Sequence, residues 1–148
     1  MTRSRSRIRS TICLVPLALL TACANHTGSL LSVQTVLEHR AMWEAQGLTS
    51  YSYTYEFWAF NRFAGQPLRL EVRADTVRSV VVVATGEVVD PRYFPTINSL
   101  FERALAAARD GSLTTVTFDR QRGYPTGLGY AAVPDALSSE RASALQPL

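Results

Sequence analysis

The stretch Tyr51-Ser52-Tyr53-Thr54-Tyr55-Glu56-Phe57-Trp58 decides the fold. Aromatic residues occupy every second position from residue 51 to residue 57, and Ser, Thr and Glu occupy the positions between them. Because successive side chains of a strand point to opposite faces of a sheet, this alternation predicts a strand with one buried aromatic face.

Further strands are expected on both sides of this one along the chain. Alternating apolar and charged residues predict a strand over residues 68–73, and the β-branched run 77–83 predicts a central strand that is buried on much of both faces. Two more strands are expected over 114–118 and 124–130, and Pro125 places the second of them at or near an edge, because proline cannot donate to a ladder.

A first helix is expected before the aromatic strand. Ser32 is in a position to cap it, and Gly47 is its expected end. Trp43 lies at the flank of its apolar stripe and is expected to clamp the helix onto the sheet. His39 is interpreted as a surface or edge residue without a catalytic role.

A second helix is expected to begin after Thr96, which is a suitable cap, and to end at Gly111. Glu102, Arg103 and Arg109 are expected to face solvent. The apolar residues recur at the helical spacing without a miss, at Ile97, Leu100, Phe101, Ala104, Leu105 and Ala108.

Short connections between consecutive strands favour antiparallel pairing. The predicted fold is a single α+β domain over residues 31–133, with a mainly antiparallel sheet of about five strands and two helices packed on one face. The predicted order is α-β-β-β-α-β-β. Residues 134–148 are rich in Ser and Ala and are expected to form a poorly specified C-terminal tail.

The first 22 residues have the pattern of a signal peptide. Four arginines precede a short apolar run over 12–20, which is too short to span a bilayer. Leu20-Thr21-Ala22-Cys23 resembles the bacterial lipobox, and this resemblance implies lipidation of Cys23 followed by a lipid-anchored linker over 23–30. We therefore expect a protein anchored by lipid to the cell membrane or the outer membrane, facing the periplasm or the cell exterior, with the membrane as its partner.

The charge of the chain argues against a nucleic-acid partner. The 15 basic residues are all arginine and give a formal net charge of +3, but four of them lie in the signal peptide. The other 11 face 12 acidic residues, so the mature domain offers no basic surface for phosphates.

The sequence contains no catalytic or metal-binding constellation, and we predict no cofactor and no enzymatic activity. The two histidines are His26 in the linker and His39 on the first helix, which makes a catalytic triad improbable. No spacing of His or Cys suits zinc, and no Asp-rich loop suits calcium. An enzyme with two facing carboxylates, or with a carboxylate beside His39, remains a third hypothesis.

Trp58 and Phe60 continue the polar register of the aromatic strand, so its outward face becomes apolar at its end. One interpretation is that the loop 61–66 folds back over both side chains. The other is that they form an exposed patch that contacts an envelope protein or a small ligand. The first interpretation fits a purely structural lipoprotein, and the second fits a non-enzymatic binding domain of the cell envelope, which is the leading hypothesis.

Several short motifs resemble a family of small bacterial lipoproteins, domain of unknown function family 6174. The motifs are Tyr51-Ser52-Tyr53, Pro95-Thr96-Ile97-Asn98-Ser99-Leu100-Phe101, and Asp119 followed by Gly123-Tyr124-Pro125-Thr126. The resemblance covers about residues 33–130. Family members carry Cys-x-Cys near the position of Trp58-Ala59-Phe60, so a role shared with them cannot depend on those thiols. The resemblance implies no activity.

Overall fold

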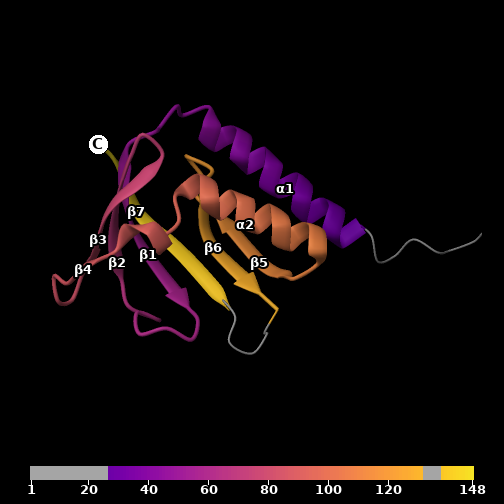
Figure 1. The fold of residues 1–148 in the computed structure, drawn as a ribbon. Helices are drawn as coiled ribbons and strands as arrows, with labels where there is room; N and C mark the ends of the chain where they lie inside the picture. The colour runs from indigo at the N-terminus through magenta and orange to yellow at the C-terminus, as the bar shows by residue number, and fades with distance from the viewer. Residues whose placement is uncertain (1–26, 132–137) are drawn as a thin grey trace, which may run out of the picture.

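The computed structural model describes residues 27–131 and 138–148, with side chains from residue 33 onward (Figure 1). Two helices lie on one face of a seven-stranded antiparallel sheet. In chain order, the elements are α1 (Thr27–Glu44), β1 (Tyr51–Trp58), β2 (Leu68–Arg73), β3 (Thr76–Val82), β4 (Val88–Val89), the 3-10 helix η1 (Pro91–Tyr93), α2 (Ile97–Asp110), β5 (Leu113–Phe118), β6 (Pro125–Tyr130) and β7 (Ser139–Pro147).

The predicted class is confirmed, but the predicted number of strands and the predicted order of elements along the chain are wrong. The strand order in the sheet is β4-β3-β2-β1-β7-β6-β5. The short β4 and the C-terminal β7 were not expected, and β7 lies between β1 and β6 although residues 134–148 were interpreted as a tail. The β-branched strand β3 is second from one edge rather than central. β6 is second from the other edge, with Pro125 as its first residue, where the missing N–H is tolerated.

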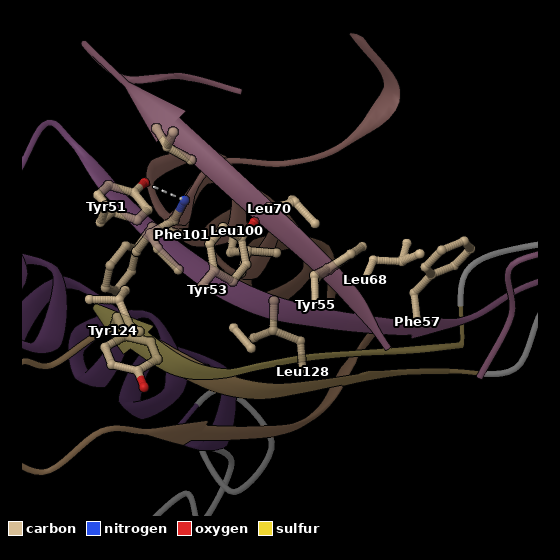
Figure 2. Packing of buried hydrophobic residues seen from close by; sticks show 14 of the residues in the cluster. Tyr51, Tyr53, Tyr55, Phe57, Leu68, Leu70, Leu100, Phe101, Tyr124 and Leu128 are labelled. Carbon is tan, nitrogen blue, oxygen red and sulfur yellow. Dashed lines mark hydrogen bonds between the residues drawn. The ribbon is translucent and has the colours of Figure 1, made fainter. Parts of the chain in front are cut away.

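The aromatic face of β1 forms the centre of the core, as its alternation predicted. Tyr51, Tyr53, Tyr55 and Phe57 are all buried, and they pack against Leu68 and Leu70 of β2 (Figure 2). The hydroxyl of Tyr51 accepts a hydrogen bond from the N–H of Ile97 at 3.0 Å, and the hydroxyl of Tyr53 donates to the carbonyl of Pro95. The tips of these rings therefore hold the start of α2 against the sheet.

Helix α2 begins and ends where the sequence predicted. The side chain of Thr96 accepts a hydrogen bond from the N–H of Ser99, and Gly111 ends the helix with φ 81°, in the left-handed region that favours glycine. The predicted apolar stripe is buried along its whole length, at Ile97, Leu100, Phe101, Ala104, Leu105 and Ala108.

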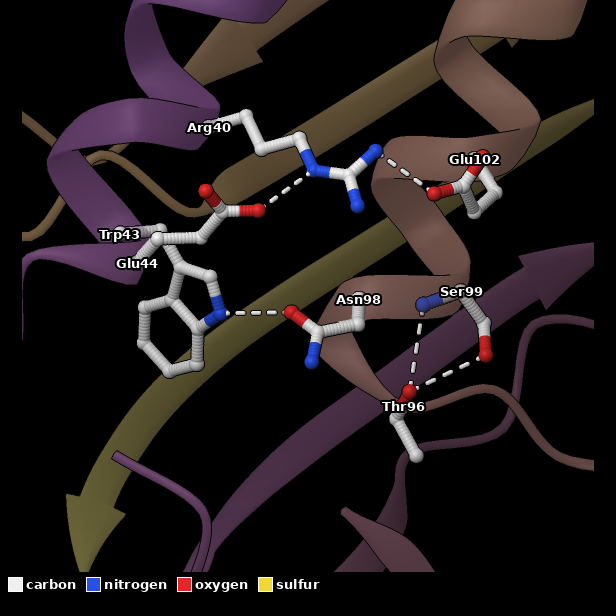
Figure 3. A network of polar contacts seen from close by, with 7 residues as sticks. All are labelled: Arg40, Trp43, Glu44, Thr96, Asn98, Ser99 and Glu102. Carbon is white, nitrogen blue, oxygen red and sulfur yellow. Dashed lines mark hydrogen bonds and ion pairs between the residues drawn. The ribbon is translucent and has the colours of Figure 1, made fainter. Parts of the chain in front are cut away.

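Helix α1 begins at Thr27, inside the segment predicted as a linker and before the predicted cap at Ser32. Trp43 is 2% exposed and packs edge-on against Tyr51 with the ring centroids 5.3 Å apart, so its predicted role as a clamp is confirmed. The Trp43 indole N–H also donates to the side chain of Asn98 on α2 at 2.9 Å (Figure 3).

A second polar contact joins the two helices. Arg40 on α1 forms ion pairs with Glu44 at 2.8 Å and with Glu102 on α2 at 2.6 Å (Figure 3). Neither helix in the described part of the chain combines the length and the apolarity that a membrane span requires. The predicted signal peptide, Cys23 and His26 lie outside the described residues.

Candidate binding site

The two residues of the predicted apolar patch, Trp58 and Phe60, differ in their exposure to solvent. Trp58 is 39% exposed, lies beside Gly65 of the β1–β2 loop, and has the guanidinium of Arg141 at 5.8 Å from its ring centroid. Phe60 is 90% exposed. The loop therefore covers Trp58 in part and leaves Phe60 open to solvent.

Phe60 belongs to the wall of a pocket of about 320 Å³ at the end of β1. This volume lies at the lower end of the range of about 300–1,000 Å³ that is typical of small-molecule sites. We call it the aromatic pocket, because five of its eight lining residues are aromatic. The lining comprises Tyr55 and Phe57 from β1, Ala59, Phe60 and Asn61 from the following loop, Tyr93 and Phe94 from η1 and the residue after it, and Arg103 from α2.

The β1–β2 loop has a defined shape that presents Phe60. The side chain of Asn61 accepts a hydrogen bond from the N–H of Phe63 at 2.9 Å, and Phe63 itself is buried. Gly65 has φ 71° and donates its N–H to the carbonyl of Phe57 at 2.8 Å. Both ends of the loop are thus tied to the core, and Phe60 lies between them.

The opposite wall of the aromatic pocket depends on a capped 3-10 turn. Asp90 accepts a hydrogen bond from the N–H of Arg92, and both its oxygens bind the Arg92 guanidinium. These hydrogen bonds hold the pKa of Asp90 below its usual range. The turn places Phe94 against Tyr55, with the ring centroids 6.4 Å apart, and leaves Tyr93 76% exposed at the rim.

Behind the aromatic pocket lies a buried carboxylate, that of Glu140 on β7. Its side chain is 1% exposed. Its Oε2 accepts hydrogen bonds from the Tyr55 hydroxyl and from Nη1 of Arg103, both at 2.9 Å, and its Oε1 accepts one from the Tyr130 hydroxyl at 2.9 Å. Arg103, which was expected to face solvent, is instead turned toward the sheet, with 39% of its side chain exposed.

Burial and hydrogen bonding shift the pKa values of the side chains around Glu140. Burial, followed by the charge of Glu140, raises the pKa of Tyr55 and of Tyr130 well above that of a free tyrosine. Burial alone would lower the pKa of Arg103, but the charge of Glu140 and its hydrogen bonds outweigh burial, and the pKa is raised. The tyrosines therefore remain protonated donors, and both oxygens of Glu140 are occupied by donors from the protein.

Within the described part of the chain, His39 is not paired with a carboxylate. Its ring packs on Phe118 with the centroids 4.0 Å apart, and its Nδ1 is buried with no hydrogen-bond partner among the described residues. Within residues 27–131 and 138–148, no cluster of three or more His, Cys, Asp or Glu side chains could hold a metal ion.

Sequence reasoning identified one side of the aromatic pocket and missed the others. The change from polar to apolar residues on the outward face of β1, which includes Phe60, was a usable signal. Arg103 was placed on the polar face of α2 by its spacing, and Glu140 lies in a segment without a recognisable pattern. Tyr93 follows Pro91 and Arg92 in a loop, where nothing local indicates that it faces residues of β1.

Comparison with known proteins gives a family and no activity. No curated protein and no solved structure matches the chain significantly. A family model described as a family of unknown function, DUF6174, matches residues 35–131. This match includes β1, α2 and the three hydrogen-bond partners of Glu140, which are Tyr55, Arg103 and Tyr130, whereas Glu140 itself lies beyond it. Since the match covers more than half of the sequence, the chain belongs to the DUF6174 family of unknown function.

Proposed function

We propose that this protein is a lipid-anchored, non-enzymatic domain of the bacterial cell envelope that binds a small ligand with an apolar body in the aromatic pocket. The observation that carries the proposal is the open aromatic wall formed by Phe60, Tyr93 and Phe94. Small-molecule sites are typically concave and lined by apolar and aromatic side chains with a few polar groups.

The lipobox Leu20-Thr21-Ala22-Cys23 supports the anchor. Residues 24–26 alone separate Cys23 from the start of α1, and three residues span at most about 11 Å. The domain would therefore lie close to the membrane surface. A pocket in such a position is suited to ligands that are present at or near the membrane.

Occupied hydrogen-bonding groups support a binding role rather than catalysis. General base catalysis requires a group that can take up a proton from a substrate. Each Glu140 oxygen already accepts at least one hydrogen bond, and the raised pKa of Tyr55 and of Tyr130 keeps both hydroxyls protonated. The remaining lining of the aromatic pocket offers aromatic surface, the hydroxyl of Tyr93, an amide and a guanidinium.

Ligand binding can be tested with N-phenyl-1-naphthylamine, a neutral apolar probe whose fluorescence rises on transfer from water. The double variant Phe60→Ser/Tyr93→Ser should bind the probe at least about tenfold more weakly, because loss of aromatic contact area costs about 1.5 kcal/mol or more. Leu37→Ser/Met42→Ser is the matched control, since both side chains are exposed on α1 outside the aromatic pocket. Absence of probe binding, or equal losses in both double variants, would contradict the proposed site.

The anchor is tested separately in the native host. Cys23→Ser should abolish incorporation of labelled palmitate and release the protein from the membrane fraction. Cys13→Ser, which removes the cysteine of the signal peptide, is the matched control and should leave both unchanged. Retention of the label after Cys23→Ser would show that the anchor is assigned to the wrong residue.

A further inference from the structure

We infer that the ligand of the aromatic pocket is a small carboxylic acid with a flat apolar body, held by its carboxylate against Arg103. This inference rests on the proposed function, because it names the chemical class that the same pocket takes. Arg103 is the one charged side chain among the eight described residues that line the pocket. The other lining residues with polar groups are Tyr93, Asn61 and Tyr55, and the hydroxyl of Tyr55 donates to Glu140.

Arg103 retains donors for a ligand although it is paired with Glu140. The contact with Glu140 uses Nη1, whereas a guanidinium carries five N–H donors in a planar fork. The side chain is 39% exposed, and it forms part of the pocket wall. A carboxylate suits the remaining donors because it can accept two parallel hydrogen bonds from one guanidinium.

The buried acid does not cancel this preference for an anion. Glu140 is 1% exposed and is not among the lining residues, so a ligand meets the guanidinium before the carboxylate behind it. The Tyr55 and Tyr130 hydroxyls also donate to Glu140, and they stabilise its negative charge from the protein side. The cation is thus presented to the pocket and the anion is shielded from it.

The rest of the aromatic pocket selects the body of the ligand. The Phe94 ring lies edge-on to both Tyr55 and Phe57, with both centroid distances 6.4 Å. A flat apolar group placed among such rings buries area on several sides and gains favourable aromatic geometry. A volume of about 320 Å³ limits the ligand to a small molecule.

Three probes that share a phenyl ring on a three-carbon chain test the inference: 3-phenylpropanoate, 3-phenylpropanamide and 3-phenylpropylammonium. Each is titrated into the isotope-labelled full chain carrying Cys23→Ser, and binding is followed by NMR. The acid should bind about tenfold more tightly than the amide, as expected for a hydrogen bond to a charged group, and the amine should bind most weakly. The acid should also shift the Nε–H signal of Arg103, and the amide should not.

A charge-balanced variant identifies the group responsible. Arg103→Gln/Glu140→Gln removes both charges together, so it leaves no orphaned ion in the core, and it should bind acid and amide equally. Arg109→Gln on the exposed side of α2 is the control and should keep the preference for the acid. If the double variant does not fold, the Arg103 Nε–H signal of the unaltered pocket still decides the question.

The outcomes separate this inference from the proposed function. Equal affinity for acid and amide, or an unchanged Arg103 signal on binding of the acid, overturns the inference, while binding of the neutral naphthylamine keeps the proposed function. A folded double variant that still prefers the acid also overturns it. Failure of every probe to bind overturns both.

Discussion

Replacing Arg103 with Met tests whether the burial of Glu140 depends on its guanidinium partner. The substitution keeps the length and helix propensity of the side chain but leaves a carboxylate that is 1% exposed without a counter-ion. Removing one partner of a buried ion pair typically costs about 3–5 kcal/mol of stability. The Tyr55 and Tyr130 hydroxyls remain as donors, so we expect a loss near the lower end, about 3 kcal/mol at pH 7.

Urea unfolding at pH 7 measures this loss, with Arg109→Met as the matched control. Arg109 lies on the exposed side of the last turn of α2, where loss of its charge costs about 0.3–1 kcal/mol through the helix dipole. The reasoning is refuted if Arg103→Met loses no more stability than its control.

Further predictions concern two turns, the β1–β2 loop and the core. Gly123→Ala should lose about 2–4 kcal/mol in urea unfolding, because its Cβ would lie 2.6 Å from the carbonyl oxygen of His39 and φ is 79°. Gly86→Ala, with φ 73° and nothing within 4 Å, should lose about 1 kcal/mol, from backbone strain alone. Phe60→Ser should change the free energy of unfolding by less than about 0.5 kcal/mol, because Phe60 is 90% exposed; a larger loss would show that Phe60 supports the fold. Burial raises the pKa of Tyr51 to about 12, so its contribution of about 3 kcal/mol should be present below pH 10 and lost between pH 10 and 12. Alkaline unfolding curves of Tyr51→Phe should therefore be flatter over that range than those of the unaltered protein.

Local sequence patterns were sufficient to predict strand β1 and helix α2. The alternation in β1 and the helical spacing in α2 concern many side chains that face one core, so a few residues suffice to define each face. The cap at Thr96 and the stop at Gly111 are chemically specific signals. Each of these features can be recognised in the sequence without knowledge of the elements that it contacts.

Strand β7 could not be predicted in the same way, because its buried positions are weakly apolar. The inward residues of β7 are Glu140, Ala142 and Leu145, and the strand is interrupted by Ala144, which has φ 51°. A buried glutamate contradicts the usual pattern of a strand. Its burial depends on donors from β1, β6 and α2, which are distant in sequence and come together only in the folded chain.

The candidate site was half predictable for a related reason. The apolar side chain of Phe60 in a polar register was visible in the sequence, and the structure leaves it exposed. The other walls come from η1 and α2, so the pocket exists only as a tertiary arrangement. Trp58 has the same sequence signal as Phe60, but the loop covers it in part. Nothing in the sequence pattern distinguishes these two environments.

The Glu140 cluster also determines the register of β7 and, through it, the position of the aromatic pocket. A slip by one residue turns every side chain of a strand to the other face. Such a slip would place Arg141 beside Arg103 and expose Glu140, which would exchange an ion pair for two like charges. The small apolar residues of β7 discriminate weakly between these registers, so the charges must supply much of the difference. Because the N–H and hydroxyl of Ser138 both donate to the carbonyl of Trp58, at 2.8 and 2.9 Å, the same register fixes the end of β1 from which the Phe60 loop departs.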